Sequence, residues 1–287
     1  EQVALDATNT TALNRVAEGA AAIYNCANPP YHRWLTDWPP IAASLLSVAE
    51  QTGAVLVTMS NLYGYGPVDH PMVESDPLRA THRKGRVRSA MWLDALAAHT
   101  AGRVRVTEAR ASDYFGPGVM GTAHLGERVV PKVLAGKAIW VIGDPDAPHS
   151  WTYLPDIGRA LAILGTDERA LGRAWHVPTN PPASQRAVVQ RIAELAGVRA
   201  PHVRGIPSWA LRAGGLALPL LRELAEVYYQ FDRPFVLDSS SFSRTFGVQP
   251  TPMDDALAST IAWWRQRPAS APARTARRGF NPTITSR

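Results

Sequence analysis

The sequence has one cysteine, Cys26, among 287 residues, and no stretch of about 18 apolar residues free of charge. A single thiol cannot form an internal disulfide or a cysteine-rich metal site, so we expect a cytoplasmic protein without a metal cofactor. The nearest apolar stretch, residues 206–221, contains Arg212 and two prolines, which argues against a membrane span. The chain begins with Glu1 and shows no signal peptide, so we expect that further sequence precedes it.

Several catalytic signatures are also missing. The eight histidines show neither H-x-x-x-H spacing nor the H-E-x-x-H pattern, so a zinc hydrolase is not expected. The sequence has no G-x-S-x-G elbow and no G-x-x-x-x-G-K-[ST] loop, which argues against a nucleophile-elbow hydrolase and against a P-loop nucleotidase.

The net charge of +6 is carried by the C-terminal end of the chain. Residues 265–287 contain six arginines and no acidic residue, so the remainder is balanced. This end is rich in proline, alanine, serine and threonine, and such a composition buries too little surface to offset the entropy of ordering. We expect a disordered basic tail at 267–287, and favour it over an arm that binds nucleic acid or an anionic membrane.

Short apolar runs alternate with helical patterns over the first 180 residues, which indicates strand–helix units on a parallel sheet. The expected strands are Val3–Leu5, Ala22–Asn25, Val55–Met59, Val104–Ala109 and Trp175–Pro178. The expected helices are Thr11–Ala17, Pro39–Thr52, Arg86–Ala101 and Asp156–Leu164.

A second part of the chain is mostly helical and is expected to form a smaller lobe that binds substrate. A helix at Glu127–Ala135 and a strand at Ala138–Ile142 already belong to it. Its further expected helices are Ser184–Ala196, Trp209–Leu216, Leu220–Tyr229 and Met253–Arg265.

Six short segments carry a resemblance to a known family. One is the turn from Thr58 to Gly64, which ends in Tyr-Gly, and another is the segment Arg110-x-x-Asp-x-Phe-Gly-Pro-Gly118. The others are Asp6-Ala7, Cys26-Ala27-Asn28, Gly143 to Asp156 and Asp238 to Pro250. In this order the segments resemble the extended or atypical short-chain dehydrogenase/reductase superfamily, in particular its NAD-dependent epimerase/dehydratase family. The segment that begins at Arg110 is similar to the family's Arg-x-x-Asn-x-Tyr-Gly-Pro-Gly.

The resemblance implies an α/β fold: a Rossmann-like doubly wound parallel sheet, here without its N-terminal strands, and a smaller helical C-terminal lobe. The dinucleotide-binding domain would comprise residues 1–111 with 155–180, and the substrate lobe residues 112–154 with 181–266. The implied cofactor is NAD or NADP. By position in the motifs, its contacts would come from Asp6, Ala7, Cys26, Ala27, Asn28, Met59, Arg88, Arg110 and Ser112.

The family opens with a strand and a glycine-rich turn that holds the pyrophosphate at a helix N-terminus. No G-x-x-G-x-x-G occurs in this sequence, which begins at about the third strand of the family's fold. Either a natural upstream segment is missing here, or the protein is a remnant that does not bind dinucleotide in the usual way.

The family's catalytic Tyr-x-x-x-Lys is altered in this chain. Counted from the turn, Lys84 falls at the tyrosine position and Arg88 at the lysine position. Arg88 can still hydrogen-bond a ribose, but a guanidinium with a pKa above about 12 is no proton shuttle. A lysine acts as a base only where burial or nearby cations lower its pKa. The other interpretation of Lys84 is the solvated basic start of a helix.

The hydroxyl that would polarise a substrate carbonyl is displaced too. Its position falls on Met59, with Thr58 and Ser60 on either side, and a slip of one residue would bring Ser60 into place. A plain cap of the strand end is the alternative. Tyr63 and Tyr65 could replace the missing phenol, although we expect Tyr63 to pack. The catalytic candidates are therefore Thr58, Ser60, Tyr63, Lys84 and Arg88.

On the substrate side, His149 stands where the family often has an arginine that grips the phosphate of a sugar nucleotide. An imidazole lacks the bidentate geometry of a guanidinium, so we expect a smaller or more apolar alcohol or carbonyl compound. A further hypothesis makes His149 the proton donor in place of the tyrosine. Buried aromatic residues also fit a plain core, but the substrate-binding candidates are Ser60, Tyr114, His149, Trp151 and Tyr153.

The favoured function is an NAD(P)-dependent oxidoreductase or epimerase/dehydratase-type enzyme that acts on a small molecule by hydride transfer. The rival is a catalytically inactive scaffold that keeps the fold and has lost both the phosphate loop and the base. The helices Pro39–Thr52 and Arg86–Ala101 match those that pair in the family's four-helix interface, which favours a homodimer.

Overall fold

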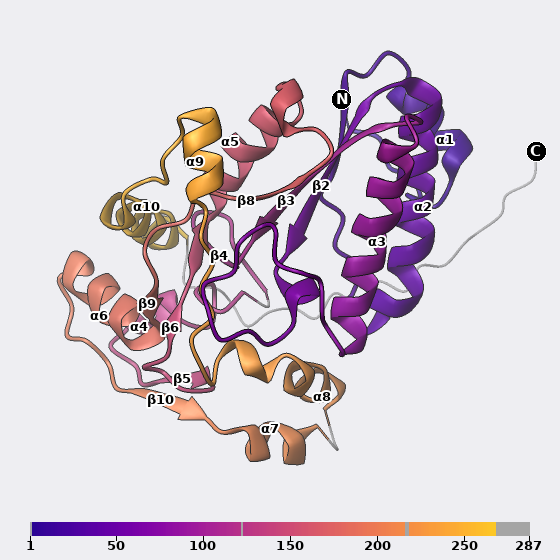
Figure 1. Cartoon of the computed structure of the whole chain (residues 1–287). Helices are drawn as coiled ribbons and strands as arrows, with labels where there is room; N and C mark the ends of the chain where they lie inside the picture. Colours follow the sequence, from indigo (N-terminus) through magenta and orange to yellow (C-terminus); the bar gives the residue numbers. More distant parts are fainter. Residues whose placement is uncertain (1, 122, 216–217, 268–287) are drawn as a thin grey trace, which may run out of the picture.

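The computed structural model describes residues 2–121, 123–215 and 218–267, so the predicted tail lies outside the described residues except for Arg267. Figure 1 shows the arrangement of the elements. The helices are α1 Thr10–Ala17, α2 Trp34–Thr52, α3 Arg83–Thr100, α4 Val130–Leu134, α5 Leu154–Leu164, α6 Gln185–Ala196, α7 Ser208–Gly214, α8 Pro219–Glu226, α9 Ser240–Phe246 and α10 Met253–Arg265, with the 3-10 helices η1 Tyr31–Arg33, η2 Tyr63–Tyr65, η3 Glu168–Ala170 and η4 Tyr228–Gln230. The strands are β1 Ala22–Asn25, β2 Val55–Asn61, β3 Arg105–Ala111, β4 Asp113–Phe115, β5 Ile139–Ile142, β6 Pro148–His149, β7 Trp151–Tyr153, β8 Ala174–His176, β9 Ala183–Ser184 and β10 Val203–Ile206.

The centre of the fold is a four-stranded parallel sheet in the order β1-β2-β3-β8. Side chains of a strand alternate between its two faces, and both faces are covered here. Val55 and Val57 pack with residues of α5 and α9, whereas Leu56 and Val106 pack with residues of α2 and α3. Figure 1 shows α2 and α3 on one side of the strands and α5 on the other. The predicted doubly wound α/β fold is confirmed.

The rest of the chain has its own apolar core, built from α4, α6 and α10 against β5 and β7. Ile139, Trp151, Val189 and Ile261 are at the centre of this core. The strand β5 pairs with β10 in parallel, and β4, which directly follows β3 of the main sheet, pairs with β7 in parallel. This core supports the loops that face the main sheet.

Two helices that border the site begin earlier than predicted. The imidazole Nδ1 of His82 accepts the backbone N–H of Gly85 at 3.1 Å, which caps α3 and moves its start from Arg86 to Arg83. The helix α2 begins before its two prolines, at Trp34, because Trp34 and Trp38 are buried in its first turns.

Other expectations of secondary structure are wrong or incomplete. The strand predicted at Val3–Leu5 is absent: these residues are irregular and mostly exposed. The strand β10 and the helix α9 were not predicted. No helix within the described parts of the chain is long and apolar enough to cross a membrane.

Candidate active site

A cavity of about 610 Å³ lies where the main sheet meets the second core. Its floor comes from the carboxyl ends of the parallel strands, where ligands of such sheets bind. Cys26, Ala27 and Asn28 follow β1, Met59 and Asn61 lie in the last three residues of β2, and residues 111–114 lead from β3 into β4. Residues of α8 and η4 complete the wall opposite the sheet.

The most unusual group in this cavity is the guanidinium of Arg88. The residue is 8% exposed and stacks on the rings of Trp38 and Trp34, with its carbon Cζ 4.4 and 5.1 Å from the ring centroids. Its Nε and Nη1 have no hydrogen-bond partner, and no carboxylate of the described residues pairs with it. Burial lowers the pKa of Arg88 from its ordinary value. A buried cation with free N–H groups requires a partner, and the cavity is where one can lie.

Lys84 lies one turn earlier on α3 but is fully engaged. Its ammonium pairs with Glu223 and, at 2.8 Å, with Glu226, both of α8, and it lies 4.7 Å from the ring centroid of Tyr31. Lys84 is 2% exposed and does not line the large cavity. Two carboxylates hold this lysine as a charged clamp between α3 and α8, and neither a free base nor a solvated helix start describes it.

The backbone fixes where α3 begins relative to the turn. A Cβ atom at Gly85 would lie 2.5 Å from the carbonyl oxygen of Tyr63, so only glycine lets the first turn of α3 approach η2 this closely. This close approach fixes the position of Lys84 and Arg88 relative to η2. The two residues are four positions apart and lie on the same face of α3.

Thr58 and Ser60, the hydroxyl residues predicted to be catalytic, lie on β2 but do not line the large cavity. Met59 and Asn61 line the large cavity. Thr58 lines a second cavity, on the face of the sheet that α2 and α3 cover, and Ser60 is buried and lines neither cavity. Alternation along a strand explains this, because Thr58 and Ser60 share one face and Met59 the other. The structure therefore does not bring Thr58 or Ser60 to the large cavity.

The tyrosines of the turn have different positions. Tyr63 lines the cavity, and its hydroxyl lies 3.2 Å from that of Tyr31. Burial raises the pKa of Tyr63, so the phenol is a poor base at neutral pH. Tyr65 is buried away from the cavity and hydrogen-bonds His176 at 2.7 Å.

Three ionisable side chains form a cluster on the opposite wall. Asp113 and His124 line the cavity, and the Asp113 carboxylate accepts a hydrogen bond of 2.8 Å from Nε2 of His149 behind it. His124 Nε2 lies 3.9 Å from the other carboxylate oxygen. Burial raises the pKa of Asp113, but the two histidines outweigh it and the net pKa is lowered. Burial lowers the pKa of His124.

Of the other predicted site residues, some line the large cavity and others do not. Ser112 and Tyr114 line the large cavity, and burial raises the pKa of Tyr114 to about 12. His149 is 2% exposed and lies behind Asp113, so it does not face the cavity. The residues that lie outside its wall are Asp6 and Ala7 before α1, Arg110 in an ion pair with Glu108, and Trp151 and Tyr153 in the second core.

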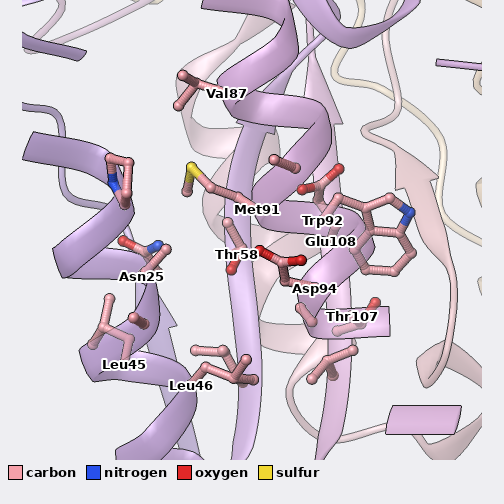
Figure 2. Close-up of a pocket in the computed structure, with 17 residues that line it drawn as sticks. Asn25, Leu45, Leu46, Thr58, Val87, Met91, Trp92, Asp94, Thr107 and Glu108 are labelled. Atoms are coloured by element: carbon pink, nitrogen blue, oxygen red, sulfur yellow. The ribbon is translucent and has the colours of Figure 1, made fainter. Parts of the chain in front are cut away.

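The second cavity, of about 220 Å³, lies between α2, α3 and the sheet (Figure 2). Leu46 and Met91 line its sides, and polar side chains of the strands, including Thr58 and Glu108, lie at its base. The Glu108 carboxylate is already bound by Arg110 at 2.6 Å. This cavity is an apolar groove between two helices, with no group of His, Cys, Asp and Glu suited to a metal ion there or elsewhere in the described residues.

Comparison with known proteins identifies the family. The model of the NAD dependent epimerase/dehydratase family matches residues 1–177. The chain belongs to this family. A family member from Streptomyces griseus, described as dTDP-glucose 4,6-dehydratase, is 26% identical over 230 residues, which are 78% of this chain and 62% of that protein. One of the same description from Xanthomonas campestris pv. campestris is 26% identical over 176 residues, 58% of this chain and 44% of that protein. The chain thus spans less than two thirds of these relatives' length.

Solved structures of other proteins show the same fold. A dTDP-glucose 4,6-dehydratase from Bacillus anthracis in complex with NAD aligns with a TM-score of 0.75 and 18% identity, over 92% of this chain and 79% of that one. A UDP-glucuronic acid 4-epimerase from Bacillus cereus in complex with NAD aligns with a TM-score of 0.74 and 16% identity, over 91% and 79%. The structure named RMD from Pseudomonas aeruginosa, complexed with NADPH, gives 0.74 and 15%, over 92% and 88%. The predicted family and fold are confirmed.

Sequence reasoning missed several residues of the cavity. Asp113 belonged to a quoted motif but was not a site candidate, and His124 was noted only for its lack of metal-ligand spacing. A carboxylate in place of the motif's asparagine was a signal for Asp113. His124 gave no such signal, because only the loop between β4 and α4 brings it back over the cavity.

Proposed function

We propose that this chain is the catalytic part of an NAD(P)-dependent oxidoreductase or epimerase/dehydratase-type enzyme that transfers hydride to or from a small apolar alcohol or carbonyl compound. The observation that carries the proposal is Arg88: a buried guanidinium with free N–H groups, at the position of the family's ribose-binding lysine, in the wall of the large cavity. A ribose diol offers the oxygen acceptors that these N–H groups lack.

The cavity fits the nicotinamide half of a dinucleotide. Arg88 would hold the ribose, and the strand-end turn from Cys26 to Asn28 would lie beneath it, with Met59 and Ser112 beside the ring. The cofactor supplies or accepts the hydride when bound. The proteins of known structure that share the fold were solved with NAD or with NADPH, and the choice between the two stays open here.

The charges of the cavity favour an uncharged substrate. Asp113 occupies the place of the motif's asparagine, and a carboxylate repels the phosphates of a sugar nucleotide. His149 cannot replace the phosphate-binding arginine because both its ring nitrogens are engaged within the protein. Leu224, Val227 and Phe231 add an apolar wall. These features support a small alcohol or ketone over the sugar nucleotides in the relatives' descriptions.

The first test is a titration of the 287-residue chain with NADH and with NADPH, in which the fluorescence of the cofactor reports binding. We expect saturable binding of at least one, and a loss of about tenfold or more in affinity for Arg88→Gln, because the charged hydrogen bonds to the ribose are removed. Arg103→Gln is the matched control, since Arg103 is an exposed arginine just beyond the same helix. The same titration is run on the chain extended by its upstream codons.

The outcomes separate the two functions considered. Binding that Arg88→Gln weakens and Arg103→Gln does not supports the enzyme. No binding of either dinucleotide by the chain or by its extended form would refute this proposal and favour the inactive scaffold. The ion-paired Lys84 and the methionine at position 59, where the family has a hydroxyl residue, favour the same alternative.

We also propose that the enzyme acts in the cytoplasm as a homodimer through α2 and α3. A single cysteine fits a reducing compartment. The apolar groove in Figure 2 lies between these two helices and the sheet, and Ala43 and Ala90, which line it, are exposed.

A further inference from the structure

The proposed reaction requires a group that moves a proton, and the family's tyrosine is absent. Lys84 at its position is clamped by two carboxylates outside the cavity. The cavity's phenols, those of Tyr31, Tyr63 and Tyr114, all have pKa values raised by burial, to about 12 for Tyr114. Arg88 stays protonated in proteins at neutral pH. None of these groups can exchange a proton readily at neutral pH.

The histidine–carboxylate cluster has the right geometry for this task. His149 Nδ1–H donates to the carbonyl oxygen of Gln230 at 3.1 Å, while Nε2 faces the Asp113 carboxylate at 2.8 Å. Both ring nitrogens are therefore engaged, and the ring holds the Asp113 carboxylate in place at the cavity wall. His149 is also stacked on Phe231 with ring centroids 5.2 Å apart, which fixes its plane.

His124 differs from His149 because it is free to react. It lines the cavity, and within the described residues neither of its ring nitrogens makes a hydrogen bond. Its ring packs on Phe231 with centroids 4.2 Å apart, and its side chain is 16% exposed in the cavity wall. The charged groups that act on it are Asp113, His149 and Arg128.

We propose that His124 is the catalytic acid and base of the reaction, that Asp113 is a positioning residue that favours its protonated form, and that His149 is a positioning residue that holds the Asp113 carboxylate in place. The inference rests on the proposed function. In the oxidative direction the O–H bond of the alcohol breaks and its proton passes to His124. A nicotinamide dinucleotide held by Arg88 would accept the hydrogen of the adjacent C–H bond with its electron pair as hydride, and the C=O bond forms. The proton then leaves His124 for solvent.

The surrounding charges set the pH dependence. Burial lowers the pKa of His124 below its ordinary value, with His149 and Arg128 adding to the effect and Asp113 opposing it. His124 is therefore neutral at about pH 7 and ready to accept a proton. The rate of alcohol oxidation should be constant above the ordinary histidine pKa and should decline as the pH falls through the lowered pKa of His124. The rate of the reverse reduction should rise as the pH falls through that pKa.

The first experiment reads the protonation states directly and needs no substrate. Ring-nitrogen NMR of histidine-labelled protein, followed from about pH 8 to about pH 5, should show that His124 gains its second proton only below the ordinary histidine pKa. Asp113→Asn should lower the pKa of His124 further, because the carboxylate that favours the protonated ring is removed. A His124 ring that titrates at or above its ordinary pKa, or whose titration Asp113→Asn leaves unchanged, would overturn the proposal.

The second experiment measures turnover of 2-butanol, cyclohexanol and 1-phenylethanol with NAD and NADP. His124→Gln should reduce turnover by about 100-fold or more, remove the acidic limb and leave dinucleotide affinity unchanged. His202→Gln, an exposed histidine elsewhere, is the control. Wild-type turnover and pH profile in His124→Gln would refute the role of His124 alone. An unchanged protein that turns over none of the alcohols would refute the proposed function, and this inference with it.

Discussion

At the scale of single residues, His176 shows how the buried network behind the site fixes a protonation state. Its Nδ1–H donates to the carbonyl oxygen of Asp238 at 2.9 Å, and its Nε2 accepts the hydroxyl proton of Tyr65 at 2.7 Å. Tyr65 in turn accepts an N–H of Arg110 at 2.7 Å. Burial lowers the pKa of His176 to about 4, and the nearby Arg110 adds to the effect.

We predict that His176 makes the fold acid-sensitive. Below about pH 6.5 the unfolded chain binds a proton at this histidine and the folded chain does not, so the free energy of unfolding falls until about pH 4 and levels off below it. The loss amounts to roughly 3 kcal/mol. Denaturant unfolding at a series of pH values should show a shallower decline for His176→Gln than for wild type or His202→Gln. Parallel pH curves for all three proteins would contradict the prediction.

The candidate site could be predicted from the sequence in part. The ordered motifs identified the strand ends whose residues line the cavity, such as Cys26 and Ser112. They could not assign Thr58 and Ser60 to a face, because a shift of one residue exchanges the two faces of a strand. The pairing of Asp113 with His149 was also out of reach, since it joins β4 to β6 across 36 residues.

At the scale of elements, the Lys84 clamp joins α3 to α8 and thereby closes the cavity wall. Lys84→Met would remove the cation that pairs with both Glu223 and Glu226 and leave Glu223 only the exposed Arg222 at 4.0 Å; breaking a buried ion pair typically costs about 3–5 kcal/mol. We therefore predict that this variant loses stability by about that amount, measured by denaturant unfolding. Lys137→Met, at an exposed lysine, should stay within about 0.5 kcal/mol of wild type. A Lys84→Met protein as stable as this control would show that the clamp contributes little.

The elements that sequence patterns predicted well are those with a strong apolar rhythm, such as the strand Ala22–Asn25, which has the predicted bounds. The helix α9 was missed because its sequence, Ser-Ser-Phe-Ser-Arg-Thr-Phe, has weak intrinsic helix propensity. It is stabilised by tertiary contact instead, since Phe242 is fully buried and lies edge-on to Trp175. The strand β10 was missed for a related reason: only pairing with β5 orders its Val-Arg-Gly-Ile sequence.

At the scale of the whole molecule, the face formed by α2 and α3 is the surface on which the proposed dimer depends. Met91 and Leu46 line an open apolar groove between these helices, and Leu93 is 53% exposed nearby on α3. In a symmetric dimer, the same two helices of a second copy would cover this groove and bury its apolar surface. The association should therefore be driven by apolar burial and tolerate salt.

We predict that the chain sediments and elutes with twice the 31.1 kDa mass of one copy. Ala90→Arg places a charged side chain in the exposed part of the groove, where a partner would have to bury it, and should shift the mass to that of the monomer. Ala187→Arg, an exposed alanine on α6, is the matched control and should leave the dimer intact. Light scattering after gel filtration measures the mass. Wild-type protein of monomer mass at high concentration would refute the dimer, and a dimer that survives Ala90→Arg would place its interface elsewhere.

Because α3 also carries Lys84 and Arg88, dimer formation should raise dinucleotide affinity by ordering that helix, so Ala90→Arg should weaken NADH binding while Ala187→Arg should not.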